Sequence, residues 1–449
     1  MTTLPCFKAY DVRGRVPDEL DAGLAFRIGQ AVATYLSPRQ VVIGHDIRLS
    51  SPALAYALGQ GFLEAGVDVL DLGLCGTEEI YFATFHLGAE GGIIVTASHN
   101  PADYNGMKFV REASQPISGD SGLKEIERLA AEGQRITAPR PGIRTSVDTK
   151  AAYLDHLLSY IDPAKLKPLT IVANPGNGCA GPVIDLLEQR LPFTFVRMQW
   201  EADGTFPHGV PNPLLPENRA ATAEMVQHHR ADFGIAWDGD FDRCFLFDEQ
   251  GGFIEGYYLV GLLAQALLAR HPGEKIIHDP RLVWNTEELV RKAGGTPVLC
   301  KTGHAFIKER MLKENALYGG EMSAHHYFRD FAYCDSGMIP WLLVAEILST
   351  TGRPLSELVK DRQAAFPVSG EINRRVSDPK AVIAKVEAAY ADTRGSRDYT
   401  DGLSFTAQDF RFNIRASNTE PVLRLNVETR GDQALLASKT AELLRLIEG

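Results

Sequence analysis

Cysteines are few in this sequence, basic residues are outnumbered by acidic ones, and long apolar runs are absent. The six cysteines contain no CxxC pair, and their spacing suits neither a zinc site nor a disulfide framework. We therefore expect reduced thiols and a cytoplasmic protein. Lys and Arg number 46 against 57 Asp and Glu, and the net charge of −11 argues against a nucleic-acid-binding protein.

Signal and membrane segments are missing as well. The N-terminus has no apolar core behind a basic start. The most apolar helix-like stretch, residues 257–269, is too short to span a bilayer and contains Gln265, so it predicts a buried helix. These features predict a protein that binds neither nucleic acid nor a membrane. We expect a monomer.

The residues that are present fit a chain of several α/β domains. Hydrophobic residues make up 45% of the 449 residues, which is ample for packed cores, and the chain is too long for one ordinary domain. Strand-like and helix-like segments alternate in three cycles, which predicts α/β layers. After about residue 365 the order becomes helix, paired strands and helix, which predicts an α+β domain. Segments rich in Pro, Gly or polar residues place the domains at 1–145, 146–250, 251–364 and 365–449.

The segment WDGDFDR, residues 237–243, carries the strongest pattern. Asp238, Asp240 and Asp242 alternate with other residues directly after an apolar strand. Three carboxylates so close repel one another, and a cation that prefers oxygen ligands, Mg²⁺ or Ca²⁺, is the usual way to hold them together. An EF-hand is disfavoured because Arg243 stands at its glycine position and the flanking segments are strands. An exposed acidic turn is the alternative, which the apolar strands on both sides weaken.

The segment TASHNP, residues 96–101, ends an apolar strand and poses a choice between a turn and a nucleophile. A serine in such a place is more often a turn or helix cap. Ser98 and His99 are neighbours, whose side chains point apart on a strand, and no GxSxG elbow is present, so a serine hydrolase is not favoured. Lys108, in the following YNGMKFV, adds a cation near the same loop. By itself the segment favours the turn.

Weaker polar segments lie at other expected strand ends. Glu321, Ser323 and His325 alternate in GGEMSAHHYF and would share one face of an extended segment, where they could bind sugar hydroxyls or form a buried polar cluster. The segment RASNTEP, residues 415–421, can wrap a phosphate or carboxylate, although a polar turn is the commoner interpretation. Weak signals by themselves are Tyr10 and Arg13 in AYDVRG, Arg281 in DPR and His304 in KTGH.

Taken in order, AYDVRG, TASHNP, YNGMK, DGDFDR, KTGH, GGEMS and RASNTEP resemble the motifs of the α-D-phosphohexomutases, in particular the bacterial phosphomannomutase/phosphoglucomutases. The resemblance runs nearly from end to end. It implies three related α/β domains and a C-terminal α+β domain of TATA-binding-protein-like fold around a central cleft. Two positions depart from the family pattern. Phe241 stands where many members have Gly, and Arg281, a planar fork rather than a point charge, stands where many have Lys.

The resemblance implies a role for each candidate residue, with Ser98 as the phosphoserine. The ligands of Mg²⁺ would be Ser98, through its phosphate, with Asp238, Asp240 and Asp242. The catalytic residues would be Ser98, Lys108 and His325 as candidate bases, and Arg13 and Arg243 for charge. The substrate-binding residues would be Tyr10, His99, Arg281, His304, Glu321, Ser323, Arg415, Ser417, Asn418 and Thr419, the last four holding the phosphate that is not reacting.

The implied reaction moves phosphate between O1 and O6 of mannose and glucose phosphates. It would pass through phosphorylated Ser98 and a hexose 1,6-bisphosphate, with glucose 1,6-bisphosphate as activator and nucleotide-sugar supply as the pathway. Several alternatives stay open: a phosphoglucosamine mutase, a metal-dependent sugar phosphatase, a glycosyltransferase that uses the aspartates to hold a nucleotide sugar's metal, or a non-catalytic sugar-phosphate-binding protein. Only a mutase needs a serine that carries phosphate.

Overall fold

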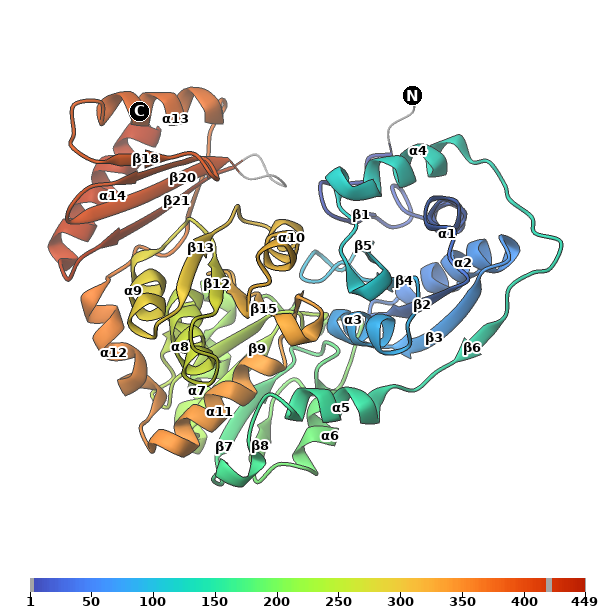
Figure 1. The fold of residues 1–449 in the computed structure, drawn as a ribbon, viewed down its shortest axis with the longest axis horizontal. Coiled ribbons are helices and arrows are strands. Elements are labelled where there is room, and N and C mark those ends of the chain that lie inside the picture. The colour runs from blue at the N-terminus through green and yellow to red at the C-terminus, as the bar shows by residue number, and fades with distance from the viewer. Residues whose placement is uncertain (1–3, 417–421, 449) are drawn as a thin grey trace. The chain divides into compact units, whose positions relative to one another are not determined.

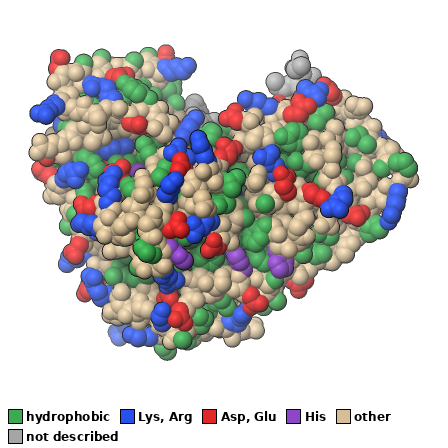
Figure 2. Space-filling view, in the orientation of Figure 1, with side chains coloured by type: hydrophobic (Ala, Val, Ile, Leu, Met, Phe, Trp, Pro, Cys, Tyr) green, Lys and Arg blue, Asp and Glu red, His purple; other side chains and the backbone are tan. Residues whose placement is uncertain are grey.

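The structure, a computed structural model, describes residues 4–416 and 422–448 (Figure 1). The chain divides into two compact units. Unit 1 is Met1–Phe253 with Tyr327–Gly352, and unit 2 is Ile254–His326 with Arg353–Gly449. No helix in the described part of the chain is long and apolar enough to cross a membrane. On the face shown in Figure 2, basic and acidic side chains are interspersed instead of gathering by sign.

Unit 1 begins with a six-stranded sheet in the order β1-β5-β4-β2-β3-β6. Strands β4, β2, β3 and β6 run parallel. At one edge β5 is antiparallel to β4, and β1 is antiparallel to β5. The strands are β1 (Val12–Arg15), β2 (Gln40–His45), β3 (Asp68–Leu74), β4 (Gly91–Val95), β5 (Tyr104–Arg111) and β6 (Arg144–Ser146). The helices are α1 (Ala22–Leu36), α2 (Ser51–Glu64), α3 (Thr77–His86) and α4 (Lys124–Glu132).

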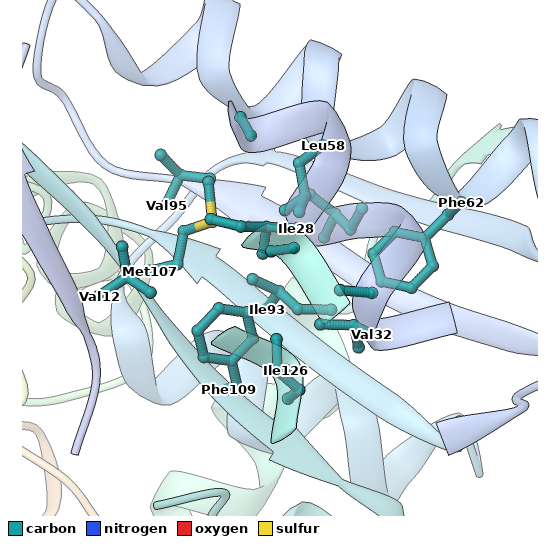
Figure 3. Close-up of a cluster of buried hydrophobic side chains, with 14 of the residues drawn as sticks. Val12, Ile28, Val32, Leu58, Phe62, Ile93, Val95, Met107, Phe109 and Ile126 are labelled. Atoms are coloured by element: carbon teal, nitrogen blue, oxygen red, sulfur yellow. The ribbon is translucent and has the colours of Figure 1, made fainter. Parts of the chain in front are cut away.

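Strand β4 is apolar along its whole length because both of its faces are covered. Ile93 and Val95 pack in a cluster with Ile28 of α1 and Met107 of β5 (Figure 3). Ile94 lies in a separate cluster with residues of α3. A strand buried on both faces is typical of a parallel sheet covered by helices. The strand therefore gives the loop that follows it, which contains Ser98, a firmly packed base.

In the second sheet of unit 1, four strands lie in the order β10-β9-β7-β8. Strands β8, β7 and β9 are parallel, and β10 is antiparallel to β9. The predicted acidic segment is the turn between these last two strands, which opens after Trp237 and closes at Cys244. The elements are α5 (Lys150–Leu158), β7 (Thr170–Asn174), α6 (Gly181–Glu188), β8 (Thr194–Arg197), α7 (Ala220–His229), β9 (Phe233–Trp237) and β10 (Cys244–Phe247), with β11 (Phe253–Ile254) at the end of the first segment.

A later segment of the chain returns to unit 1. It contains the antiparallel pair β15 (His326–Phe328) and β16 (Cys334–Asp335), followed by α11 (Ile339–Thr351). The ring of Trp341 on α11 meets Phe193 and Phe195 edge-on, at centroid distances of 6.4 and 5.8 Å. Aromatic contacts of this kind add to apolar burial, so they help to fix the returning segment in the unit.

A buried carboxyl group, Glu78, joins three segments of unit 1. Its Oε1 accepts hydrogen bonds from the hydroxyls of Tyr153 (2.5 Å) and Ser336 (2.9 Å). Its Oε2 accepts from the backbone N–H groups of Gly337 (2.5 Å) and Met338 (3.2 Å). Burial raises the pKa of Glu78 to about 8, against the lowering effect of these hydrogen bonds. Since both hydroxyls can also accept, the arrangement accommodates a proton on Oε1.

Glu78→Gln is expected to remove part of the pH dependence of stability. The folded-state pKa of Glu78, about 8, lies above the ordinary 4.5. Between these two pH values the folded protein holds a proton that the unfolded chain has released. The stabilisation is complete below pH 4.5 and is lost as the pH rises to about 8. The free energy of unfolding falls by at most about 1.4 kcal/mol per pH unit in this range. Gln mimics the protonated carboxyl, so urea unfolding at about pH 6 and about pH 9 should show a smaller fall in the variant. Equal falls in wild type, Glu78→Gln and the surface control Glu64→Gln would contradict this.

Unit 2 contains the third α/β region, with parallel strands in the order β13-β12-β14. The apolar stretch 257–269 lies within helix α8, which is largely buried, so the predicted core helix is confirmed. The elements are α8 (Gly256–Arg270), β12 (Lys275–His278), α9 (Trp284–Lys292), β13 (Thr296–Leu299), α10 (His304–Glu314), β14 (Tyr318–Gly320) and α12 (Leu355–Ala365).

The C-terminal part of unit 2 is an antiparallel sheet with two helices (Figure 1). Its five strands run in the order β17-β21-β20-β19-β18, and apolar residues of the sheet and of α13 and α14 form one core. The elements are β17 (Ile372–Arg375), α13 (Pro379–Ala389), β18 (Ser396–Asp398), β19 (Leu403–Thr406), β20 (Phe410–Ala416), β21 (Val422–Thr429) and α14 (Gln433–Glu448). The predicted change from α/β to α+β organisation is confirmed.

Candidate active site

Ser98 lies in the loop between β4 and β5 and has an unusual backbone conformation. Its φ is +48°, in the left-handed region that residues with a side chain rarely adopt. Its N–H donates to Oγ1 of Thr96 (2.9 Å), and its own Oγ donates to Oδ2 of Asp238 (2.8 Å). Non-glycine residues held in this region cluster at functional sites. The backbone thus aims a buried serine hydroxyl at a carboxylate 140 residues further along the chain.

The relation of Ser98 to His99 differs from the prediction. The two side chains do not point apart, because Ser98 is left-handed and not extended, and its Oγ lies 3.1 Å from Nδ1 of His99. Partial burial, Arg243 and Arg13 hold the pKa of His99 well below its usual range, so the ring is neutral at pH 7. A carboxylate and an imidazole therefore both lie within hydrogen-bond distance of one hydroxyl.

The three aspartates of the β9–β10 turn converge as predicted. Asp238, Asp240 and Asp242 are all buried, and each offers an oxygen within 4.8 Å of those of the others. Burial, followed by the charges of Asp242 and Asp240, raises the pKa of Asp238 to about 7. An exposed acidic turn is therefore wrong, and the cluster is a site where a cation would relieve both desolvation and repulsion.

The two oxygens of Asp240 have different surroundings. Oδ2 accepts hydrogen bonds from Oγ1 of Thr77 (2.6 Å) and from Nζ of Lys108 (2.7 Å). Oδ1 is buried and has no hydrogen-bond partner among the residues that the structure describes. Such an atom is costly unless something outside the chain satisfies it. The donor set, made of carboxylate oxygens, fits a hard divalent cation.

Three predicted cations surround the same turn. Nζ of Lys108, on β5, lies 2.5 Å from Asp242 and also pairs with Asp240. Burial alone would lower the pKa of Lys108, but these two carboxylates outweigh it and raise the pKa above its usual value. Nε of Arg243 lies 3.6 Å from Asp238, and Arg13 on β1 donates to the side chain of Asn100 (2.5 Å). Tyr10 lies, partly buried, just before β1.

Close backbone approach explains the glycine and phenylalanine positions of the acidic turn. A Cβ on Gly239 would lie 2.8 Å from the carbonyl oxygen of Ser98, so only glycine lets the two loops meet. The buried ring of Phe241 lies against Gly76, where a Cβ would come within 2.1 Å of it. Phe241 therefore packs against the start of α3 and leaves the aspartates in place.

Unit 2 carries a second group of predicted site residues, in a different local structure from the one expected. Residues 321–325 form a turn, with Glu321 N–H donating to the carbonyl of His325 (3.0 Å), and not an extended segment. The turn still unites the polar side chains, because Nδ1 of His325 lies 3.1 Å from the carboxylate of Glu321. His304 begins α10, with its ring centroid 6.5 Å from that of His325, and Ser323 Oγ lies 3.3 Å from Arg281.

Guanidinium groups gather around one carboxylate, Glu371, in the same unit. It lies 3.5 Å from Arg281, 3.5 Å from Arg415 and 3.3 Å from Arg424. Arg415 and Arg424 are opposite one another on β20 and β21. Convergent guanidinium groups are suited to a phosphate. The predicted phosphate contacts Ser417, Asn418 and Thr419 lie outside the described residues.

Several residues of these groups were not foreseen. Thr77 and Asn100 hold Asp240 and Arg13, and Glu371 and Arg424 complete the arginine cluster. Thr77 begins a helix and Asn100 lies in TASHNP. Both follow expected strand ends, where α/β folds gather ligands, and this position could have indicated them as site residues. Glu371 and Arg424 gave no such signal because β-pairing over about fifty residues brings them together.

Comparison with known proteins covers the whole chain. The sequence matches the phosphoglucomutase/phosphomannomutase family in its alpha/beta/alpha domains I, II and III, over residues 5–136, 151–252 and 255–366, and in its C-terminal domain, over residues 371–446. The chain belongs to this family. The predicted resemblance and the predicted fold class, three α/β domains and a C-terminal α+β domain, are confirmed.

Relatives within the phosphoglucomutase/phosphomannomutase family match from end to end. A phosphomannomutase of Salmonella montevideo is 61% identical over 454 residues, and phosphohexose mutases of Xanthomonas campestris pv. campestris are 62% identical over 448 residues, each match covering 100% of both chains. A phosphoglucomutase/phosphomannomutase family protein from Burkholderia thailandensis has a solved structure that aligns with a TM-score of 0.89 at 32% identity, covering 100% of this chain and 98% of that one.

Proposed function

We propose that this protein is a phosphohexose mutase that moves a phosphoryl group between O1 and O6 of mannose and glucose phosphates. The observation that carries the proposal is the placement of Ser98, whose Oγ lies 2.8 Å from one of three buried, convergent aspartates. A cation held by these aspartates would offset the charge that a phosphoserine brings, whereas a serine hydrolase has no such charge to offset. Full-length relatives named phosphomannomutase and phosphohexose mutases support the same reaction.

The proposed reaction has two equivalent halves. The bond between phosphorus and Ser98 Oγ breaks, and a bond from phosphorus to the oxygen of the free sugar hydroxyl forms. The hydroxyl proton passes to a base, and Ser98 Oγ takes up a proton. The resulting hexose 1,6-bisphosphate then returns its other phosphoryl group to Ser98. Glucose 1,6-bisphosphate would act as the activator because it would phosphorylate Ser98 in protein molecules that lack the phosphoryl group.

We infer Mg²⁺ as the metal, held by Asp238, Asp240 and Asp242 with the serine phosphate. Bound there, it would neutralise the roughly −1.5 to −2 charges that phosphoserine brings among three carboxylates. The buried Oδ1 of Asp240, which has no partner in the described part of the chain, supports this assignment. Lys108 and Arg243 would add positive charge on the protein side of the same turn.

His325 and Lys108 are the two candidate bases. Lys108 is held as a cation by Asp240 and Asp242, so it suits charge balance better than proton abstraction. His325 makes a hydrogen bond at Nδ1 with Glu321, which orients the ring, and imidazole is the commonest general base in enzymes. We therefore propose His325 as the base.

The remaining predicted residues would bind substrate. Glu321, Ser323 and His304 would contact sugar hydroxyls, and Arg281 would contact phosphate. The phosphate that is not reacting would be held by Arg415, Ser417, Asn418 and Thr419, while Tyr10 and His99 would contact substrate near Ser98. We also propose the division into domains at 1–145, 146–250, 251–364 and 365–449, which the ranges of the four family matches support, and a cytoplasmic monomer.

Phosphorus NMR tests the function directly. The protein is mixed with mannose 1-phosphate, Mg²⁺ and a trace of glucose 1,6-bisphosphate, and the mannose 6-phosphate signal should grow without release of inorganic phosphate. Glucose 1-phosphate should be converted in the same way. Release of inorganic phosphate would favour the sugar phosphatase, and conversion of glucosamine phosphate alone would favour the phosphoglucosamine mutase.

A further inference from the structure

A buried arginine, Arg48, lies beneath the loop that carries Ser98. Its side chain is 1% exposed. One terminal nitrogen donates to the carbonyls of Pro101 (2.7 Å) and Tyr104 (2.9 Å). The other donates to the carbonyls of Ser98 (2.9 Å) and Asn100 (2.6 Å). A single guanidinium group therefore binds three carbonyls of the loop and that of the first residue of β5, for which its planar fork of donors is suited.

Arg48 is itself held in place from below. Its backbone N–H donates to Oδ1 of Asp46 (3.0 Å), and its Nε lies 3.4 Å from Oδ2 of the same carboxylate. That carboxylate also accepts from Thr96 (2.7 Å), whose hydroxyl oxygen accepts the N–H of Ser98 (2.9 Å). Both peptide groups of Ser98 are thus tied to one network, the N–H through Thr96 and the carbonyl through Arg48.

The flat side of the guanidinium group is covered as well. The ring centroid of Phe206 lies 5.3 Å from Cζ of Arg48, within the range of a cation–π contact. The cation is therefore fixed in position and orientation. The loop it holds is strained, because Ser98 has a φ of +48°. A conformation of this kind persists only where its surroundings determine it.

We propose that Arg48 is a positioning residue for phosphoryl transfer, one that keeps the Ser98 loop in the conformation from which Oγ faces the aspartates. This inference rests on the proposed function. Arg48 does not touch the reacting atoms, since its contacts are to backbone carbonyls. Its loss would leave the substrate-binding groups of unit 2 intact and would displace the reacting oxygen, so it should lower kcat and leave KM nearly unchanged.

Arg48→Lys tests the proposal, with Arg219→Lys as the matched control. Lysine presents one nitrogen and cannot reach four carbonyls. A small displacement of a reacting group lowers rates by about 10²-fold, so we expect kcat for mannose 1-phosphate to fall by about that factor, with KM changed by less than about threefold. Arg219 also donates to loop carbonyls of unit 1, those of Pro213 and Leu214, and its change to Lys should leave kcat within about twofold.

Melting temperatures and a second variant distinguish a loss of positioning from a loss of folded protein. The melting temperatures of both variants show whether a fall in kcat exceeds any loss of folded protein. If Arg48→Lys does not fold, Asp46→Asn, which loosens Arg48 without removing it, should show the same selective fall in kcat at smaller size. Folded variants of Arg48 or Asp46 with wild-type kcat would overturn the proposal. Absence of turnover in the wild type would instead overturn the proposed function.

Discussion

Replacing Ser98 by alanine is expected to reduce mutase turnover by about 10⁴-fold or more, as loss of a nucleophile does in other enzymes. The proposed reaction passes through a phosphoryl group on Oγ, and alanine has no atom that can carry it. Substrate binding should persist because the groups proposed to bind sugar and phosphate are unchanged. Turnover is measured with mannose 1-phosphate under the conditions of the NMR experiment, and binding by calorimetry.

Ser114→Ala is the matched control. Ser114 is also buried and also left-handed, with a φ of +55°, and its hydroxyl donates to the carbonyl of Tyr81 (2.7 Å). This change removes the same hydroxyl from the same backbone conformation, and turnover should stay within about threefold, which is the scale of an effect on folding alone. Wild-type turnover in Ser98→Ala would exclude the phosphoserine mechanism.

Asp240→Asn is expected to weaken divalent-cation binding by about 10²-fold and turnover by about 10³-fold, because it removes one charged ligand of the proposed site. The amide of asparagine also has only one oxygen, so it cannot both accept from Thr77 and Lys108 and bind the cation as the two carboxylate oxygens would. Its NH₂ group must face either Lys108 and Thr77, which are donors, or the position of the cation. Turnover is measured against Mg²⁺ concentration, and Mn²⁺ binding by electron paramagnetic resonance.

Asp248→Asn provides the control for charge. Asp248 directly follows β10, and its carboxylate accepts hydrogen bonds from the backbone N–H groups of Gln250 (2.9 Å) and Gly252 (2.7 Å). The net charge changes equally in both variants, so only Asp240→Asn should alter cation affinity. Chelation of the metal should abolish wild-type turnover, and added Mg²⁺ should restore it. Equal cation affinity in wild type and Asp240→Asn would contradict the assignment of the site.

The alternation of strands and helices, and the acidic turn between two strands, could be predicted from the sequence because both are local. A strand buried on both faces gives a continuous apolar run, and three aspartates within five residues imply their own proximity. The contact of Ser98 with Asp238 could not be deduced from these segments separately, since it joins two sheets. The order of motifs shared with the phosphohexomutases provided that link.

The predictions that failed were about local conformation. Ser98 and His99 were expected on a strand, where side chains point apart, but the left-handed φ of Ser98 brings them within 3.1 Å. Residues 321–325 were expected to be extended, but hydrogen bonds within them close a turn. At Ser98 a tertiary contact, from Arg48 to its carbonyl, holds a backbone conformation that propensity does not favour, whereas the turn at 321–325 is closed locally. Arg48 gave no signal either, because its role depends on carbonyls about fifty residues away.

Detection of phosphate on Ser98 tests the central claim most directly. The protein is incubated with glucose 1,6-bisphosphate and Mg²⁺, digested, and its peptides are analysed by mass spectrometry before and after a chase with excess mannose 1-phosphate. We expect one phosphoryl group on Ser98, which the chase transfers to the sugar as a hexose 1,6-bisphosphate. No phosphate on Ser98, phosphate on a different residue, or a phosphoserine that the chase leaves in place would contradict the account.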